Sequence, residues 1–194
     1  MPTSALQVAR TGLEAQDARM RVIANNLANV GTTGFKRDRA NFATLAYQDT
    51  RVAGQQSSGE TAYAEGLNLG TGVAVQSTSQ IMTQGTLDTT GNAFDLALDG
   101  DGFFQIAMPG GKIGYTRAGN FTRSAEGMLV TQQGFAVQPE ITVPEGATAI
   151  AISPDGTVSA SINGEAEPTE LGQIQIARFT NPAGLQALGD NFLA

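Results

Sequence analysis

The feature that most constrains this chain is a seven-residue repeat of apolar side chains near its start. Residues 3–30 contain no proline and are predicted to form one long helix. The repeat places an apolar residue at seven of its eight positions, which is typical of a helix that packs against other helices. We call these seven positions the seam: Leu6, Ala9, Leu13, Met20, Ile23, Leu27 and Val30. Gln16 is the one polar residue in the repeat.

The seam has two possible partners, the chain's own domain and the helices of other subunits. After residue 50 the sequence shows strand-like alternation and turns, and no second helix of comparable length is predicted. An isolated helix of this length is only marginally stable in water, because helices are stabilised mostly by packing. We therefore favour the second partner and expect the helix to be disordered alone and ordered in an assembly.

The next segment is short of apolar residues. Residues 35–48 are amphipathic, and residues 49–72 are rich in Gly, Gln, Ser and Thr. A stretch of this composition cannot bury a core of its own, so it is predicted to be a long loop or an extended arm with a role at an interface.

From Val73 onward the apolar period changes to two, which indicates strands. The predicted strands are residues 73–81, 94–99, 103–108, 128–131, 135–138, 149–152, 157–162 and 173–179. Turn signals separate them at residues 109–111, 126–127, 154–156 and 163–164. The fold class is therefore predicted to be α+β, with a long heptad helix followed by an extended arm and a mainly antiparallel all-β domain.

The composition excludes most familiar classes of enzyme active site and metal site. The chain has no Cys and no His, which removes thiolate nucleophiles, imidazole metal ligands and Ser-His-Asp triads. Residues 1–39 carry six basic and three acidic side chains, whereas residues 40–194 carry five and fifteen. An acidic body of this kind argues against nucleic-acid binding. No run of about 18 apolar residues is present, so no membrane insertion is expected. Arg10, Glu14 and Asp17 interrupt the apolar region that a secretory signal needs.

Three carboxylates, Asp95, Asp99 and Asp101, are the one candidate for an active site. Paired carboxylates can act as acid and base on a glycosidic bond. On a strand, however, Asp95 and Asp99 lie on the solvent side. A calcium loop that starts at Asp99 needs Glu at its twelfth position, where Gly110 stands. We therefore predict no catalytic, cofactor or metal site.

A polar motif ends the predicted helix. Residues 24–36 read ANNLANVGTTGFK, and its three asparagines are poor helix formers. Their amides suit hydrogen bonds to neighbouring backbone in a packed assembly, and Gly31 and Gly34 permit a sharp exit. The spacing alone does not distinguish this from an ordinary polar helix end.

This motif resembles the N-terminal signature shared by the rod and hook proteins of the bacterial flagellum. The matching residues are Asn25, Asn26, Leu27, Ala28, Asn29, Thr33, Gly34, Phe35 and Lys36. A second signature, in the predicted β domain, consists of Gly100, Gly102, Phe103 and Phe104. Further matches at residues 84–87, 115–121 and 127–131 extend the resemblance over essentially the whole chain.

Within this family the chain is most similar to distal rod proteins, on residues 11–16 and on the arm at residues 47–66. The resemblance implies a structural subunit, not an enzyme, which needs no cofactor and polymerises into the rigid hollow driveshaft from motor to hook. It also implies four regions: an assembly helix with the signature at 1–34, an amphipathic linker and arm at 35–72, a β-rich outer domain at 73–180, and a return segment at 181–194.

The implied partners are further copies of the chain, proximal rod and hook proteins, and the surrounding periplasmic and outer-membrane rings. The implied location is the periplasm-spanning rod of the basal body, reached without a cleaved signal peptide. Family members end in a second long helix, which is absent here, so we expect this chain to be truncated after Ala194. The alternatives are a hook or proximal rod subunit and, in another class, a secreted β-domain enzyme or adhesin acting on polysaccharide.

Overall fold

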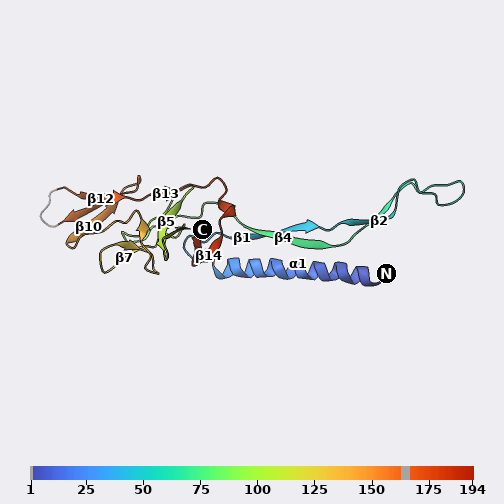
Figure 1. Ribbon diagram of the computed structural model, residues 1–194, viewed down its shortest axis with the longest axis horizontal. Coiled ribbons are helices and arrows are strands. Elements are labelled where there is room, and N and C mark those ends of the chain that lie inside the picture. The colour runs from blue at the N-terminus through green and yellow to red at the C-terminus, as the bar shows by residue number, and fades with distance from the viewer. Residues whose placement is uncertain (1, 163–166) are drawn as a thin grey trace. The chain divides into compact units, whose positions relative to one another are not determined.

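A computed structural model describes residues 2–162 and 167–194, which form two compact units (Figure 1). Unit 1 comprises the chain up to Val30 together with Arg37–Ile81. Unit 2 comprises Gly31–Lys36 together with Met82–Ala194. The chain therefore enters unit 2 briefly, returns to unit 1, and then completes unit 2.

Unit 1 consists of one helix and one long antiparallel ribbon. The helix α1 spans Pro2–Ala28. In the ribbon, β1 (Asp38–Thr44) pairs with β4 (Val73–Gln80), and β2 (Tyr47–Arg51) pairs with β3 (Leu67–Gly70). Residues 52–66 connect β2 to β3, and we call them the ribbon tip. Figure 1 shows the tip beyond the N-terminal end of α1. The segment predicted to be a long loop or an extended arm is therefore paired backbone where β2 meets β3.

The helix packs on the ribbon through a stripe of small side chains. Val8, Thr11, Ala15, Ala18 and Val22 are three or four residues apart and share one face, which contacts β1 and β4. Ala15 is only 6% exposed. Small side chains allow the helix axis to approach the ribbon closely.

The hydroxyl of Thr11 fixes the position of α1 along the ribbon. Thr11 Oγ1 donates to the carbonyl of Val8 at 2.9 Å and accepts from the amide of Val73 at 3.4 Å. Gly72 has φ +122°, and a Cβ there would collide with the Thr11 side chain. This close approach requires glycine at position 72.

The seam stays exposed, as expected from the lack of a partner helix, but another face of α1 packs on the ribbon. Positions 8, 15 and 22 follow the seam positions 6, 13 and 20 by two residues, which is about 200° around the helix. One face of α1 therefore rests on the ribbon while the seam lies on the other side. The sequence pattern concealed the second face because its residues are small.

Unit 2 is built from short antiparallel strands. One six-stranded sheet has the order β13-β5-β6-β15-β14, with β9 also paired to β5; a second sheet has the order β10-β11-β12, and β7 pairs with β8. The bounds are β5 Phe103–Met108, β6 Lys112–Thr116, β7 Thr122–Arg123, β8 Leu129–Val130, β9 Val137–Gln138, β10 Ala147–Ile152, β11 Thr157–Ile162, β12 Thr169–Gln173, β13 Ile176–Ala177, β14 Ala187–Gly189 and β15 Phe192–Leu193. A 3-10 turn, η1, spans Pro182–Gly184.

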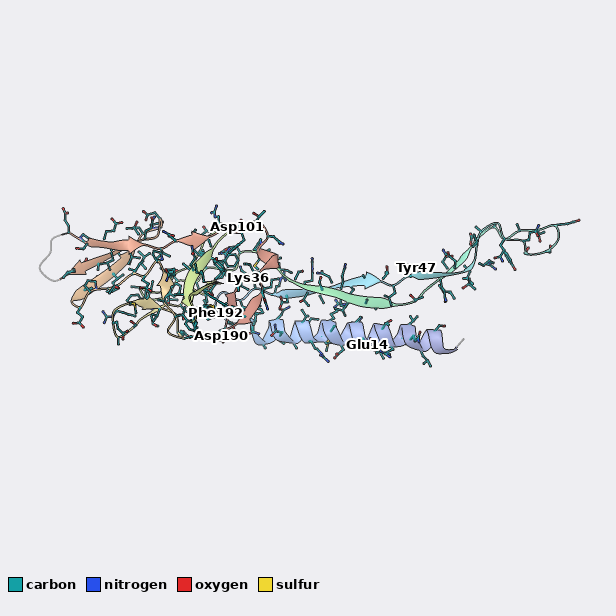
Figure 2. The ribbon with its side chains drawn as sticks, in the orientation of Figure 1. Glu14, Lys36, Tyr47, Asp101, Asp190 and Phe192 are labelled. Atoms are coloured by element: carbon teal, nitrogen blue, oxygen red, sulfur yellow. The ribbon has the colours of Figure 1, made fainter. Side chains whose placement is uncertain are left out.

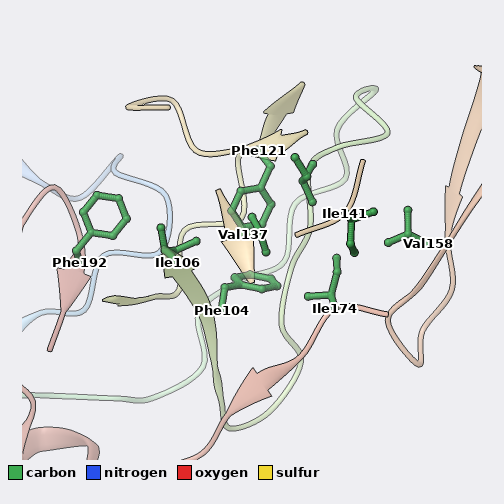
Figure 3. Packing of buried hydrophobic residues seen from close by; sticks show 9 residues of the cluster. Phe104, Ile106, Phe121, Val137, Ile141, Val158, Ile174 and Phe192 are labelled. Carbon is green, nitrogen blue, oxygen red and sulfur yellow. The ribbon is translucent and has the colours of Figure 1, made fainter. Parts of the chain in front are cut away.

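A hydrophobic core joins the two larger sheets of unit 2 (Figure 3). Phe104 and Ile106 enter it from β5, and Val158 enters it from β11. The rings of Phe104 and Phe121 meet edge to face, with centroids 5.1 Å apart. Burying each of these side chains contributes about 1.5–3 kcal/mol, so this core is the main source of stability in unit 2.

The predicted α+β class is confirmed, and several strands match closely. Residues 103–108 and 157–162 form β5 and β11, and residues 73–80 form β4. The turns at 109–111 and 154–156 are confirmed by positive φ at Gly110, Gly111 and Gly156. The predicted turn at 163–164 lies outside the described residues.

Four predicted strands are wrong in part. Of residues 128–131 and 135–138, only Leu129–Val130 and Val137–Gln138 form strands. Residues 94–99 make a single bridge, Asp95 to Asn120, although Phe94, Leu96 and Leu98 pack on the core as the alternation predicts. The segment 173–179 is divided, because the amide of Ile174 turns to bond the carbonyl of Gly156 at 2.9 Å. Only Ile176–Ala177 of that segment forms β13.

Candidate assembly surface

The seam is the most exposed apolar feature of α1. Leu13 and Leu27 expose 72% and 71% of their surface, and Leu6, Met20 and Ile23 are also exposed. Ala9 is exposed on the same stripe, as is the polar Gln16. A line of large apolar side chains in water is costly and marks an interaction surface. Val30, the last predicted seam position, lies two residues beyond the end of α1, in a turn.

Charged side chains beside the seam form pairs along the helix. Arg10 Nε donates to Glu14 at 2.7 Å, and Arg21 contacts Asp17 at 2.8 Å, both with four-residue spacing. Figure 2 labels Glu14 on α1. Exposed pairs of this kind contribute little stability because water screens them, so they support the helix without anchoring it.

The signature asparagines hold the end of α1. The Asn26 side chain accepts from the amide of Asp38 at 2.9 Å and donates to its carbonyl at 2.8 Å, which ties the last helical turn to the start of β1. Burial raises the pKa of Asp38 at this junction. Asn29 Nδ2 donates to the carbonyl of Asn25 at 2.9 Å. Leu27 stays exposed between them, and Ala28 ends the helix.

The rest of the signature belongs to unit 2. Gly34 has φ +73°, and a Cβ there would lie 2.5 Å from the amide nitrogen of Ala118. Only glycine fits this approach. Asn191 Nδ2 donates to the carbonyl of Thr33 at 3.0 Å, and the amide of Phe35 donates to the carbonyl of Thr32 at 3.2 Å. Gly31, by contrast, has open space around it, so only Gly34 is required by the exit.

Two cationic side chains of unit 2, Lys36 and Arg117, donate hydrogen bonds to backbone carbonyls. Lys36 Nζ donates to the carbonyl of Thr83 at 2.7 Å, and burial together with the nearby Arg117 lowers the pKa of Lys36. Arg117 Nη2 donates to the carbonyl of Gly100 at 2.7 Å. Burial lowers the pKa of Arg117, and the nearby Asp101 carboxylate opposes that shift.

The β-domain signature sits against these cations. Gly100 and Gly102 have positive φ, which suits the turn before β5. The guanidinium carbon of Arg117 lies 5.4 Å from the ring centroid of Phe103, within the range of a cation–π contact. Phe104, the next residue, enters the core. From the sequence, Arg117 was identified only within the family match at residues 115–121, and no role was predicted for it.

The three candidate carboxylates have local roles or none. Asp95 accepts from Thr90 Oγ1 at 2.7 Å and from Asn92 Nδ2 at 2.9 Å, which closes the loop before it. Asp99 is exposed, and the carbonyl of Asp101 accepts from Arg178 Nε at 3.1 Å. Within residues 2–162 and 167–194, no group of three His, Cys, Asp or Glu side chains is placed to hold a metal ion.

α1 is the helix long enough to be considered as a membrane span, and its charged and polar residues make it unsuitable. No helix in the described part of the chain is long and apolar enough to cross a membrane.

A helix with an exposed apolar seam and a separate β unit with its own core are typical of a protein that interacts with other chains. Two family models match within this architecture. The model described as flagella basal body rod protein matches residues 6–36, and the flagellar hook protein FlgE/F/G D1 domain matches residues 97–160. The first match spans most of α1 and the whole signature.

Individual relatives point to the same family. The chain is 48% identical over 186 residues to the flagellar basal-body rod protein FlgG of Buchnera aphidicola subsp. Acyrthosiphon pisum, covering 96% of this chain and 72% of that protein. It is 46% identical over 191 residues to FlgG of Agrobacterium fabrum, covering 98% and 73%. A flagellar hook protein, FlgE of Helicobacter mustelae, is 40% identical over 129 residues, covering 66% of this chain and 28% of that protein.

The chain belongs to the flagellar basal-body rod protein family, and the predicted resemblance is confirmed. It is a structural subunit of the distal rod, located in the flagellar basal body. The relatives reported above carry the names of rod and hook proteins, not of enzymes, and a rod subunit assembles with other rod and hook components.

Proposed function

We propose that this chain polymerises through the seam of α1 into the rigid hollow driveshaft that carries torque across the periplasm from motor to hook. The observation that carries the proposal is the division of α1 into two faces. The small face is already covered by β1 and β4, whereas the large apolar face is exposed. Burial of the seam against helices of neighbouring copies contributes about 1.5–3 kcal/mol for each large side chain.

We assign further roles to the regions around the helix. The assembly helix and signature at 1–34 form the inner tube, and the arm within 35–72 braces neighbouring subunits. The β-rich region predicted at 73–180 forms the outer surface from Met82 onward, because β4 belongs to unit 1 and packs on α1. The partners are then further copies, proximal rod and hook proteins, and the periplasmic and outer-membrane rings. The paired backbone of β2 and β3 supports the brace, because a ribbon is stiffer than a loop.

Export without a cleaved signal peptide, through the flagellar type III apparatus, fits the composition. A chain without Cys or His cannot be trapped by disulfides or bound metals while it passes unfolded. The chain has no catalytic task in this proposal.

The seam is tested by Leu13→Asp in flagellated cells that make only this variant. A charge buried in a helix contact is strongly destabilising, so we expect no complete rods in electron micrographs and no swimming. Gln7→Asp, which places the same carboxylate on α1 outside the seam, is the matched control and should assemble. Complete rods with Leu13→Asp would contradict the proposal.

The distal rod assignment is tested by removing the outer half of the ribbon. Thr71 Oγ1 donates to the carbonyl of Ala46 at 2.6 Å, so these two residues are already neighbours. Deleting residues 47–70 and joining Ala46 to Thr71 through Asn-Gly leaves β1 and β4 paired. We expect rods that bend in electron micrographs. Rods of unchanged stiffness would favour a hook or proximal rod subunit.

The polysaccharide alternative is tested by replacing Asp95, Asp99 and Asp101 with Asn together. An amide retains a hydrogen-bond acceptor for Thr90, so the loop should persist. Swimming should be unchanged. A hydrolytic activity of the chain on polysaccharide that this variant abolishes would overturn the structural role.

A further inference from the structure

A cluster of three basic side chains stands out on unit 2. This unit carries twelve acidic and only five basic side chains. Three of the five lie near one another, namely Lys36, Arg117 and Arg178. Arg117 bonds the carbonyl of Gly100, Arg178 bonds that of Asp101, and Lys36 is close enough to Arg117 for the charge of Arg117 to act on it. We call these three residues the basic cluster. Figure 2 labels Lys36 and Asp101.

The cluster lacks a matching set of carboxylates. Both ion pairs found in the described part of the chain lie on α1, so no member of the cluster has a salt bridge there. The bonds of Lys36, Arg117 and Arg178 go to backbone carbonyls, and Arg117 also reaches the side-chain oxygen of Gln84 at 3.5 Å. Asp101 is the one carboxylate that acts on Arg117. A partly buried, under-neutralised set of cations favours an anionic partner.

The ribbon tip has the complementary charge. Residues 52–66 contain Glu60 and Glu65 and no basic side chain. Both carboxylates are exposed, and neither makes a hydrogen bond or an ion pair within the described residues. The adjacent Arg51 is occupied, because its guanidinium carbon lies 4.0 Å from the ring centroid of Tyr63.

The tip is also ordered before it meets a partner. The amide of Tyr63 donates to the carbonyl of Gln55 at 2.9 Å, and the amide of Ser57 donates to the carbonyl of Thr61 at 2.9 Å. Ser57 and Ser58 hydroxyls both contact Thr61 Oγ1. A hairpin already fixed by these bonds loses little conformational entropy on docking.

We propose that the ribbon tip of one subunit docks its glutamates, Glu60 and Glu65, on the basic cluster of a second copy. The inference rests on the proposed polymerisation and specifies the surface that the ribbon braces. The cluster is the contact in unit 2, and Arg178, its exposed member, meets the tip first. The docked carboxylates supply the ion pairs that these cations lack among the described residues.

The absence of cysteine allows a direct test by disulfide crosslinking of assembled rods. Glu60→Cys combined with Arg178→Cys should give a ladder of linked subunits on mild oxidation, with a linked fraction about tenfold above that of either single variant. Glu60→Cys with Lys112→Cys, another exposed basic position of unit 2, is the matched control. No ladder, a linked monomer, or an equal ladder in the control would each overturn the proposal.

Charge exchange gives an independent readout. Glu60→Lys with Glu65→Lys should weaken rods, seen as about a fivefold increase in broken rods after salt extraction, and so should Arg178→Glu. The three changes together should restore intact rods, whereas Glu140→Lys should have no effect. Failure of the restoration would overturn the docking. If Leu13→Asp still blocks assembly, the proposed polymerisation survives that failure.

Discussion

Unit 1 and unit 2 use their apolar residues in opposite ways. In unit 2, Phe104 and Ile106 are almost completely buried, 2% and 0% exposed, and belong to one core. In unit 1, Ala15 is the one hydrophobic side chain that the described residues bury, while leucines of the seam lie in water. The difference shows that unit 2 is stabilised from within, whereas unit 1 leaves much of its apolar surface exposed.

Unit 1 also relies on hydrogen bonds to hold its helix in place. Unit 1 is held by a few specific polar contacts, such as those from Asn26 to Asp38 and from Thr11 to Val73. These contacts position the helix without covering the seam. In the proposed assembly, this exposed surface is the one that neighbouring subunits contact.

The largest expected effect comes from the core of unit 2. Phe104→Ala should lower the free energy of unfolding of unit 2 by about 3–5 kcal/mol, because it removes a buried ring and leaves a cavity. Thermal melting followed by the near-ultraviolet circular dichroism of the aromatic side chains measures this. Leu13→Ala, a similar truncation on the exposed seam, should change stability by less than about 0.5 kcal/mol. Equal losses for the two variants would remove the contrast between the units.

A smaller effect should be confined to unit 1. Asn26→Ala removes both hydrogen bonds to Asp38 and should cost about 1–2 kcal/mol in the attachment of α1. Hydrogen exchange should then quicken at the amide of Asp38 and in the last turn of α1. Exchange within β5 should not change. Slower or unchanged exchange at Asp38 would show that Asn26 does not hold the helix end.

The smallest effect is a pH dependence at the same junction. Burial raises the pKa of Asp38, so its folded form favours the protonated acid. The stability it contributes is full below its ordinary carboxyl pKa and is lost as the pH rises through the raised folded pKa. Asp38→Asn should flatten this part of the stability profile of unit 1 in melts between pH 3 and pH 7. A profile of unchanged slope would show that another group titrates there.

The sequence predicts best those elements that carry a strong local pattern. The helix, the strand at 103–108 and the turn at Gly110 and Gly111 follow from periodicity and turn chemistry. The pairing of β2 with β3 was missed because residues 49–72 have few apolar side chains, and their pairing depends on partners about twenty residues away. The strand at 112–116 was missed because it is short and contains Gly114.

Of the two packing faces of α1, the sequence pattern revealed only the seam. Large residues reveal the seam, whereas the small residues around Ala15 reveal nothing until the ribbon is placed beside them. Lys36 and Gly34 were found through the resemblance, but their roles depend on residues far away in the sequence. Lys36 bonds the carbonyl of Thr83, and Gly34 lies against the backbone of Ala118, about eighty residues later. Contacts at this distance in sequence leave no periodic signal.

The most direct test of the central claim is the reactivity of a thiol placed in the seam. In a chain without cysteine, Leu13→Cys provides one thiol at an exposed position, and Glu140→Cys provides an exposed control in unit 2. Maleimide labelling is followed in the secreted monomer and in purified rods. We expect the thiol at position 13 to react rapidly in the monomer and to be protected in rods, with the control reactive in both. Equal reactivity of the thiol at position 13 in monomer and rods would contradict the claim that the seam is the assembly surface.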